Sequence, residues 1–206
     1  MPTTSPTRER ILTAAVELFA ERGYSGTSIG EIESAAGLSP RSGALYKHFP
    51  SKRALLETAL AERMEEIEDF STRFELQPLG DMRSELTIAA RWGLAELNRE
   101  RDLSRIVMRE GEQMPELAAR FRDAIVLPGL ELATRTVERY ARERGFAIDD
   151  PRALGEVLCA SLVGYALQQT LFGDDATGVD PERFVGAWVE ATAAIVESLE
   201  RSAAHA

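Results

Sequence analysis

Hydrophobic residues recur along this chain at the three- and four-residue spacing of helices, and no segment shows the strict alternation of a half-buried strand. The first such segment predicts a helix that begins at Pro6, behind Ser5 as its cap, and ends near Gly23. Leu18 and Phe19 lie on its apolar face. The chain is therefore expected to open with an amphipathic helix.

Two shorter helices are predicted to follow closely. Ser28 and Glu31 have the spacing of a capping box, in which each side chain bonds the backbone of the other at a helix start. Gly37 stands where a helix stops in a left-handed conformation. A third helix must then begin almost at once, with Ser39 or Ser42 as its cap.

From Lys52 onward the pattern changes to long amphipathic helices separated by proline and glycine. The Asp-Pro pairs at Asp150 and Asp180 indicate helix starts, so these acids are expected to be caps and not catalytic groups. The predicted fold is all-α, with about nine helices in all. It comprises a small N-terminal domain over residues 1–56 and a larger helical bundle over residues 57–206.

The composition is typical of a folded, soluble protein, with 44% hydrophobic and 28% charged residues. No stretch approaches the roughly 18 apolar residues of a membrane span, and residues 1–10 lack the apolar core of a signal peptide. We therefore expect a cytoplasmic location. Cys159 is the single cysteine, which excludes an intrachain disulfide.

The net charge of −10 argues against nucleic acid as a partner unless the charge is unevenly distributed, and it is. Residues 1–56 carry seven basic and five acidic side chains, which leaves a net charge of −12 on the rest. The chain's two lysines, Lys47 and Lys52, lie in the acid-free stretch between Glu33 and Glu57. This basic segment is a candidate for binding phosphate, although charges also cluster by chance on solvated faces.

Residues that carry catalysis are scarce. Histidine occurs only at His48 and His205, so a His-rich zinc site is excluded, and the Glu-x-x-His pairs of di-iron bundles are missing. The sequence also lacks a glycine-rich phosphate loop and a Gly-x-Ser-x-Gly nucleophile elbow. We expect no cofactor, no metal and no enzymatic activity. An enzyme that uses only carboxylates and arginines is a less favoured alternative.

The runs Thr27–Ser39 and Gly43–Leu56 closely resemble the DNA-binding domain of the TetR (tetracycline repressor) family. The segments Thr7–Leu12 and Leu18–Tyr24 are similar to that family's first helix, so the resemblance extends over about residues 7–56. It implies a helix-turn-helix, in which one helix braces a second that enters the major groove of DNA. For the rest of the chain it implies a helical domain that binds a ligand and pairs with a second copy.

The resemblance assigns DNA contacts to residues of three kinds: groups at the start of the second helix that meet phosphates, side chains that hold the DNA backbone on the other side, and residues that face bases. The first kind comprises Thr27 and Ser28, the second Tyr46, His48 and Lys52, and the third Arg41, Ser42, Gly43 and Lys47, with Ser39 at the turn. Tyr46 suits packing equally well, and Phe49 is expected in the core.

Two positions depart from the family's pattern. Pro40-Arg41-Ser42 stands between Ser39 and Gly43, where the family usually has a single residue. Either the turn is longer or the reading helix starts earlier, which leaves the individual base contacts open. Glu33 stands where the family tends to have alanine.

The resemblance also implies a ligand cavity in the larger domain. Large, adaptable side chains there suit such a cavity, although for any one of the apolar ones a packed core is the commoner role. The candidates for ligand binding are Met64, Trp92, Met108, Met114, Phe121, Tyr165, Gln168, Gln169 and Phe172. The two glutamines stand in an otherwise apolar helix, where a buried amide requires a partner.

The resemblance further implies that the last two helices pair with their counterparts in a second copy. Apolar residues of the final helix spread over more than one stripe, which indicates a second apolar surface. They are Phe184, Val185, Trp188, Val189, Ile195, Val196 and Leu199. The helix before it interleaves leucines with small residues such as Gly155 and Gly164, which permit close approach.

The sequence therefore predicts a transcriptional repressor that binds a palindromic, double-stranded DNA operator as a homodimer and is released by a small-molecule ligand. The first alternative is a regulator of the same fold that answers to a partner protein or to no ligand. The second is a helical enzyme or carrier.

Overall fold

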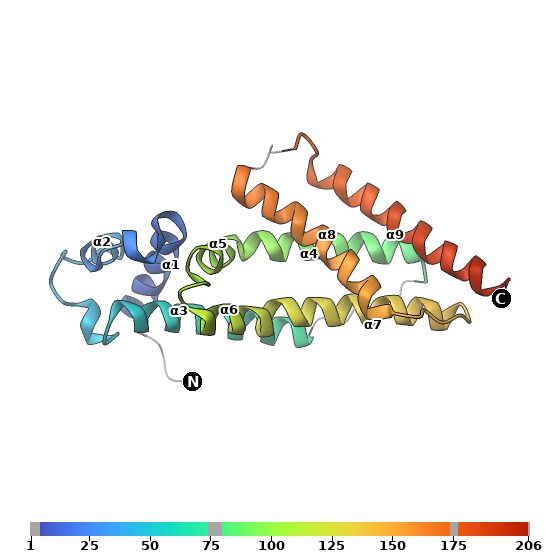
Figure 1. Cartoon of the computed structure of the whole chain (residues 1–206). Helices are drawn as coiled ribbons and strands as arrows, with labels where there is room; N and C mark the ends of the chain where they lie inside the picture. The colour runs from blue at the N-terminus through green and yellow to red at the C-terminus, as the bar shows by residue number, and fades with distance from the viewer. Residues whose placement is uncertain (1–4, 74–79, 174–176, 206) are drawn as a thin grey trace. The chain divides into compact units, whose positions relative to one another are not determined.

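The structure, a computed structural model, describes the backbone of residues 5–73, 80–173 and 177–205, and the side chains of these ranges except 63–73. Throughout these ranges the regular elements are helical, which confirms the predicted all-α fold of about nine helices (Figure 1). The chain divides into two compact units. The first comprises residues 1–71 and 100–125, and the second residues 72–99 and 126–206.

The first unit opens with α1 (Pro6–Gly26). Pro6 occupies its first turn as predicted, but the Ser5 side chain makes no capping bond, so that part of the prediction is wrong. Gly23 leaves the helical conformation with a φ of 78°, which confirms the predicted helix end near this residue. Glycine adopts this left-handed φ at little cost, because it has no Cβ.

The second helix, α2 (Ile29–Ala35), has both bonds of the predicted capping box. The Ser28 Oγ accepts the Glu31 N–H at 3.3 Å, and the Glu31 Oε2 accepts the Ser28 N–H at 2.8 Å. Gly37 ends the helix with a φ of 71°, again as predicted. Local bonding between neighbours in the sequence therefore sets both ends of α2.

The third helical element is much shorter than predicted. It is η1 (Leu45–Lys47), a single 3-10 turn, and the described stretch between α2 and α3 (Lys52–Arg73) contains no α-helix. Arg41 and Gly43 have left-handed φ values of 60° and 71°, and Pro40 has no N–H to donate. A third helical element is therefore present, reduced to a single turn, and of the two alternatives for the inserted residues the longer turn is the one observed.

One core holds the first unit together. Its fully buried side chains include Ile11 and Phe19 of α1, Ile32 of α2 and Leu45 of η1. Burial of each such side chain contributes roughly 1.5–3 kcal/mol. Buried residues from α5 (Arg101–Glu110) and α6 (Pro115–Phe121) complete this core.

The first unit is thus larger than the predicted N-terminal domain of residues 1–56. The reason is that α5 packs along α1, although the two helices lie far apart in the sequence. A single turn of π-helix, η2 (Arg122–Val126), follows α6.

The second unit is built from α4 (Met82–Arg99), α7 (Leu127–Glu143), α8 (Pro151–Phe172) and α9 (Pro181–Ala203). Helix α8 packs on α7 and α4, and α9 packs on α4. Figure 1 shows α8 running obliquely over α7. None of the described helices is both long and apolar enough to cross a lipid bilayer.

The two Asp-Pro helix starts of the second unit are confirmed. Asp150 accepts the Ala153 N–H at 2.9 Å, and Asp180 accepts the Arg183 N–H at 3.0 Å. Each carboxylate therefore caps a helix, with the following proline in the first turn.

A buried polar network joins α4 to α7 in the second unit. Glu85 is 2% exposed, and its Oε2 accepts the Tyr140 hydroxyl at 2.7 Å and the Arg139 Nη2 at 2.6 Å. Burial, and then the bond to Glu85, raises the pKa of the Tyr140 hydroxyl far above its ordinary value. Tyr140 therefore stays protonated and donates to the carboxylate.

Candidate nucleic-acid interface

The residues predicted to face DNA bases lie together on the segment of residues 38–48, called here the reading segment. Its exposed members are Ser39, Pro40, Arg41, Ser42, Tyr46 and Lys47, while Gly43 and His48 are half-buried. Tyr46 is 57% exposed, which does not favour the packing alternative, whereas Phe49 is 3% exposed, which confirms its predicted place in the core.

No exposed carboxylate lies on the reading segment. The sequence has no acid between Glu33 and Glu57, and the Glu33 side chain is 0% exposed. Arg41 and Lys47 are therefore the charged groups that this segment presents to solvent. Its surface is positive, although the whole chain carries a net charge of −10.

Arg41 is held in an unusual backbone conformation. Its φ of 60° is left-handed, which costs a residue other than glycine roughly 1–2 kcal/mol. Its aliphatic stem lies close to α2, because a Cβ placed on Gly30 would stand 3.4 Å from the Arg41 Cγ. A Cβ at that distance would be at about ordinary van der Waals contact, and the Arg41 side chain remains exposed.

The hydroxyl of Thr27, predicted to meet phosphate, is buried instead. Thr27 is 2% exposed, and its Oγ1 donates toward the carbonyls of Gly23 at 2.9 Å and Leu18 at 3.1 Å. This side chain stabilises the end of α1. Ser28 is exposed as predicted, with its Oγ engaged in the capping box.

Lys52, predicted to hold the DNA backbone, is half-buried and bonds to the protein backbone. Its ammonium donates to the Tyr24 carbonyl and, at 2.6 Å, to the Thr27 carbonyl. It also lies 4.2 Å from the centroid of the Tyr24 ring, within the range of a cation–π interaction. Burial lowers the pKa of this amine, while the charges of Glu110 and Glu31 act in the opposite direction.

The end of α5 bonds directly to the end of α1. Glu110 Oε1 accepts the Tyr24 N–H at 2.8 Å, and Arg109 Nη1 donates to the carbonyls of Ala20 at 2.9 Å and Glu21 at 2.8 Å. Neither α5 residue was singled out in the sequence. An Arg-Glu pair at the end of an amphipathic helix is too common to indicate a tertiary contact.

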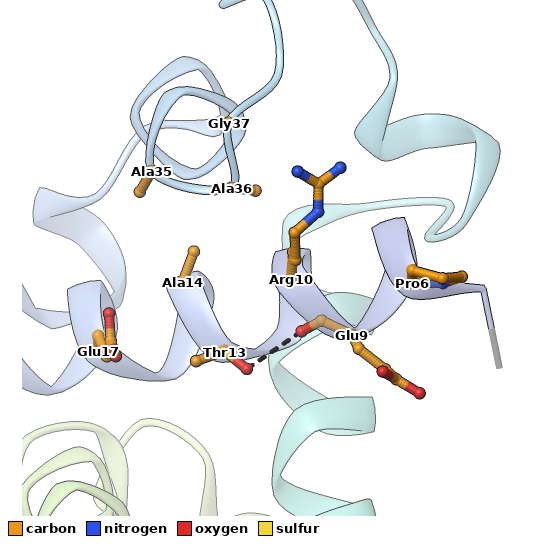
Figure 2. A pocket seen from close by; sticks show the side chains of 9 residues that line it. All are labelled: Pro6, Glu9, Arg10, Thr13, Ala14, Glu17, Ala35, Ala36 and Gly37. Carbon is orange, nitrogen blue, oxygen red and sulfur yellow. Dashed lines mark hydrogen bonds between the residues drawn. The ribbon is translucent and has the colours of Figure 1, made fainter.

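A groove of about 650 Å³ separates the first half of α1 from the end of α2 (Figure 2). Figure 2 shows Arg10 pointing from α1 toward Gly37, and a Cβ added to Gly37 would lie 3.3 Å from the Arg10 Nη1. Glycine is therefore favoured at position 37 by its positive φ, since the Arg10 guanidinium, at the end of a flexible side chain, would need to move only slightly to admit a Cβ. The groove does not include the reading segment.

The candidate ligand residues are divided between the two compact units. Met108, Met114 and Phe121 belong to the first, Trp92 and the four candidates of α8 to the second. Met64 lies outside the residues whose side chains are described. Met114 is buried beside a cavity of about 80 Å³, whereas Met108 is 44% exposed.

The four candidates of α8 differ in burial. Gln168 is exposed and Phe172 is 74% exposed, whereas Tyr165 and Gln169 are buried. The Tyr165 hydroxyl donates to the Val179 carbonyl at 2.8 Å. Both polar atoms of the Gln169 side chain are buried and have no hydrogen-bond partner among the residues that the structure describes.

Comparison with known proteins agrees with this geometry. The model of the family "Bacterial regulatory proteins, tetR family" matches residues 11–59. UidR of Escherichia coli K12, an HTH-type transcriptional regulator, is 43% identical over 60 residues, which are 29% of this chain and 30% of UidR. AcrR of Shigella flexneri is 35% identical over 116 residues, which are 54% of this chain and 53% of AcrR. The chain therefore matches about half, or less, of the length of these curated relatives.

The match with a solved structure extends over the whole fold. Salmonella enterica GusR is 26% identical, with a TM-score of 0.64, over 96% of this chain and 98% of GusR. The family model covers the capping box of α2, the turn and the reading segment. UidR and AcrR are both named as HTH-type transcriptional regulators, which does not favour the alternative of a helical enzyme or carrier. Residues 11–59 therefore match the DNA-binding domain of bacterial regulatory proteins of the tetR family, and the fold of the whole chain is similar to that of GusR.

Proposed function

We propose that this regulator is a repressor that binds a palindromic operator as a homodimer and releases it when a small molecule binds to the second unit. The observation that carries the proposal is the reading segment itself. It presents Arg41, Ser42, Tyr46 and Lys47 to solvent from a turn whose anchors, Leu45 and Phe49, are buried. A positive and polar segment of this kind, anchored by buried side chains, suits the groove of double-stranded DNA.

Within the reading segment, the roles follow from exposure and chemistry. Arg41 can donate two hydrogen bonds to the edge of a guanine, which reads sequence. Lys47 and Tyr46 suit phosphates, together with Ser39 and His48. Ser42 and Gly43 lie beside Arg41, where a base edge approaches. Thr27 and Lys52 bond the end of α1 and the segment between α1 and α2, through the contacts described above.

An uncharged face on α8 and α9 supports the proposed dimer. On α8, positions at the spacing of one helical face are exposed or half-buried: Val157, Ser161, Gly164, Gln168 and Leu171. On α9 the same holds for Ala187, Ala191, Ala194, Ile195 and Ser198. Neither set contains a charged residue, although the chain as a whole is 28% charged. Small and apolar residues in such rows pack against a second helix pair, so we propose a second copy as the partner.

Gln169 supports a ligand that bears a polar group. Leaving both atoms of a buried amide without partners costs free energy, which a ligand that donates and accepts hydrogen bonds would recover. Trp92 belongs to the same compact unit and offers a fluorescent signal for binding. Control by a partner protein, or by no ligand, is the alternative.

Selection of bound fragments from a pool of random DNA tests the proposal. We expect a palindrome whose half-sites are centred about one helical turn, or roughly 34 Å, apart. A recovered sequence without symmetry would contradict the homodimer. Binding that shows no preference for any sequence would contradict operator recognition itself.

A further inference from the structure

One residue of α2, Glu33, fixes both ends of the turn that carries Arg41. Its backbone carbonyl accepts the Leu38 N–H at 2.8 Å, where the turn begins. Its side-chain Oε1 accepts the Leu45 N–H at 3.1 Å, where the turn ends and η1 begins. The Ser42 hydroxyl lies 3.5 Å from the same oxygen, at the limit of a hydrogen bond.

The carboxylate of Glu33 is a costly group at this position. The residue is 0% exposed, and its Oε2 is buried with no partner among the described residues. A buried carboxylate oxygen without a partner destabilises a fold, and an apolar side chain would satisfy packing alone. Ile32 of α2 and Ala36, which follows the helix, are buried nearby in the sequence and show that apolar side chains fit this interior. A carboxylate at Glu33 is explained if the turn needs its oxygen as a hydrogen-bond acceptor.

The Leu45 N–H needs that acceptor. It belongs to the first residue of a 3-10 turn, where a backbone donor has no partner within the helix, and Leu45 is 0% exposed. The inserted Pro40-Arg41-Ser42 makes the preceding turn long and gives it two left-handed residues, Arg41 and Gly43. A long turn can adopt more conformations than a short one, so a buried hydrogen bond at its end, from the Leu45 N–H to Glu33, restricts it to fewer.

We infer that Glu33 is a positioning residue for sequence recognition: its buried carboxylate holds the Leu45 N–H and thereby fixes the long turn that presents Arg41 and Ser42 to DNA. This inference rests on the proposed operator binding. Glu33 touches no base itself. It acts on specificity through the turn and leaves the general attraction of Lys47 and Tyr46 for phosphates unchanged.

The test compares the full-length wild type with Glu33→Ala, Glu33→Gln and Ser34→Ala, the last being an exposed neighbour on α2 as the control. The measured quantity is the ratio of affinities for the palindrome recovered by selection and for a duplex of the same bases in scrambled order. We expect Glu33→Ala to lower this ratio by about tenfold while its affinity for the scrambled duplex stays within about twofold. Glu33→Gln keeps an oxygen that accepts from Leu45, so it should retain the ratio to within about threefold.

Two results would overturn the inference: a ratio unchanged in a folded Glu33→Ala protein, or equal losses on both duplexes. If Glu33→Ala does not fold, the amide resonance of Leu45 in Glu33→Gln decides. It should move upfield when the acceptor loses its charge, whereas amides outside residues 36–48 should not move. A Leu45 resonance that does not move would overturn the inference. Failure of the wild type to prefer any DNA sequence would count against the proposed function, and the resonance would still test the anchor.

Discussion

The ammonium of Lys52 donates a hydrogen bond to the carbonyl oxygen of Thr27, 2.6 Å away, and so ties the start of α3 to the segment between α1 and α2. The ammonium makes a second bond, to the Tyr24 carbonyl, and lies over the Tyr24 ring, while the Lys52 side chain is half-buried. The other lysine of the chain, Lys47, is exposed on η1. The two lysines therefore have different roles, which substitution can separate.

Lys52→Met is expected to lower the free energy of unfolding by roughly 1–3 kcal/mol, because two backbone carbonyls lose their donor. Lys47→Met, the matched control, should change stability by less than about 0.5 kcal/mol but weaken binding to every DNA sequence. It should also reduce the dependence of log affinity on log salt by about one unit. Denaturant unfolding and salt titrations measure the two effects. The reverse pattern would show that Lys52 is the phosphate ligand.

Arg41→Gly should separate base reading from folding. The variant removes the guanidinium and also relieves the left-handed φ of 60°, so the protein should be at least as stable as the wild type. Operator affinity should nevertheless fall by roughly 1–3 kcal/mol, at particular base pairs of the recovered site. Repeating the selection with Arg41→Gly shows which base pairs lose their preference. Preferences unchanged at every base pair would exclude Arg41 from base reading.

Ala191→Glu places a carboxylate in the uncharged face of α9 and should convert dimers to monomers. A charge buried without a partner in an interface costs several kcal/mol, and the exposed Ala191 has no such cost in the monomer. Ala147→Glu is the control, because the same change falls on an exposed residue outside α8 and α9. Light scattering gives the mass of each variant. Dimers of normal mass for Ala191→Glu would place the interface elsewhere.

Trp188 is a less suitable site for that test. Its Nε1 donates to the Ser161 Oγ at 2.8 Å, so substitution would also damage the packing of α9 on α8 within one protomer.

Gln169→Leu should leave stability unchanged or raise it slightly, because it removes two unpartnered polar atoms from the interior. The same change should weaken any ligand that uses the amide. Compounds are found by their effect on Trp92 fluorescence, with Gln168→Leu, an exposed neighbour, as the control. For a true inducer, saturating operator lowers the ligand affinity by the factor by which saturating ligand lowers the operator affinity, typically about 5 to 150-fold. A compound that Gln169→Leu binds as tightly as the wild type does not use this amide.

Tyr140 should make the protein less stable in alkali. Its pKa is raised in the folded state, so above the ordinary tyrosine value of 10.0 the unfolded chain releases a proton that the folded chain keeps. The contribution of Tyr140 is therefore fully present below pH 10.0 and decreases as the pH rises above it. Unfolding free energies of the wild type should fall more steeply across this range than those of Tyr140→Phe. Parallel pH profiles would contradict the assignment.

The sequence alone predicts those helix starts and ends that are set by hydrogen bonds between residues close together in the chain. The capping box of Ser28 and Glu31, the end of α2 at Gly37 and the caps at Asp150 and Asp180 are of this kind. The helical periodicity predicted the all-α fold, and a run of residues in the right order predicted the DNA-binding family.

The tertiary structure decided what depends on residues far apart in the chain. Only folding shows that Thr27 turns inward, that Lys52 bonds the end of α1, and that the carboxylate of Glu33 is buried against Leu45. The length of the turn could not be read from the sequence either, because Pro40-Arg41-Ser42 is compatible with both a longer turn and an earlier helix. Local propensity does not distinguish a longer turn from an earlier helix start. The packing of the first unit's core stabilises the longer turn.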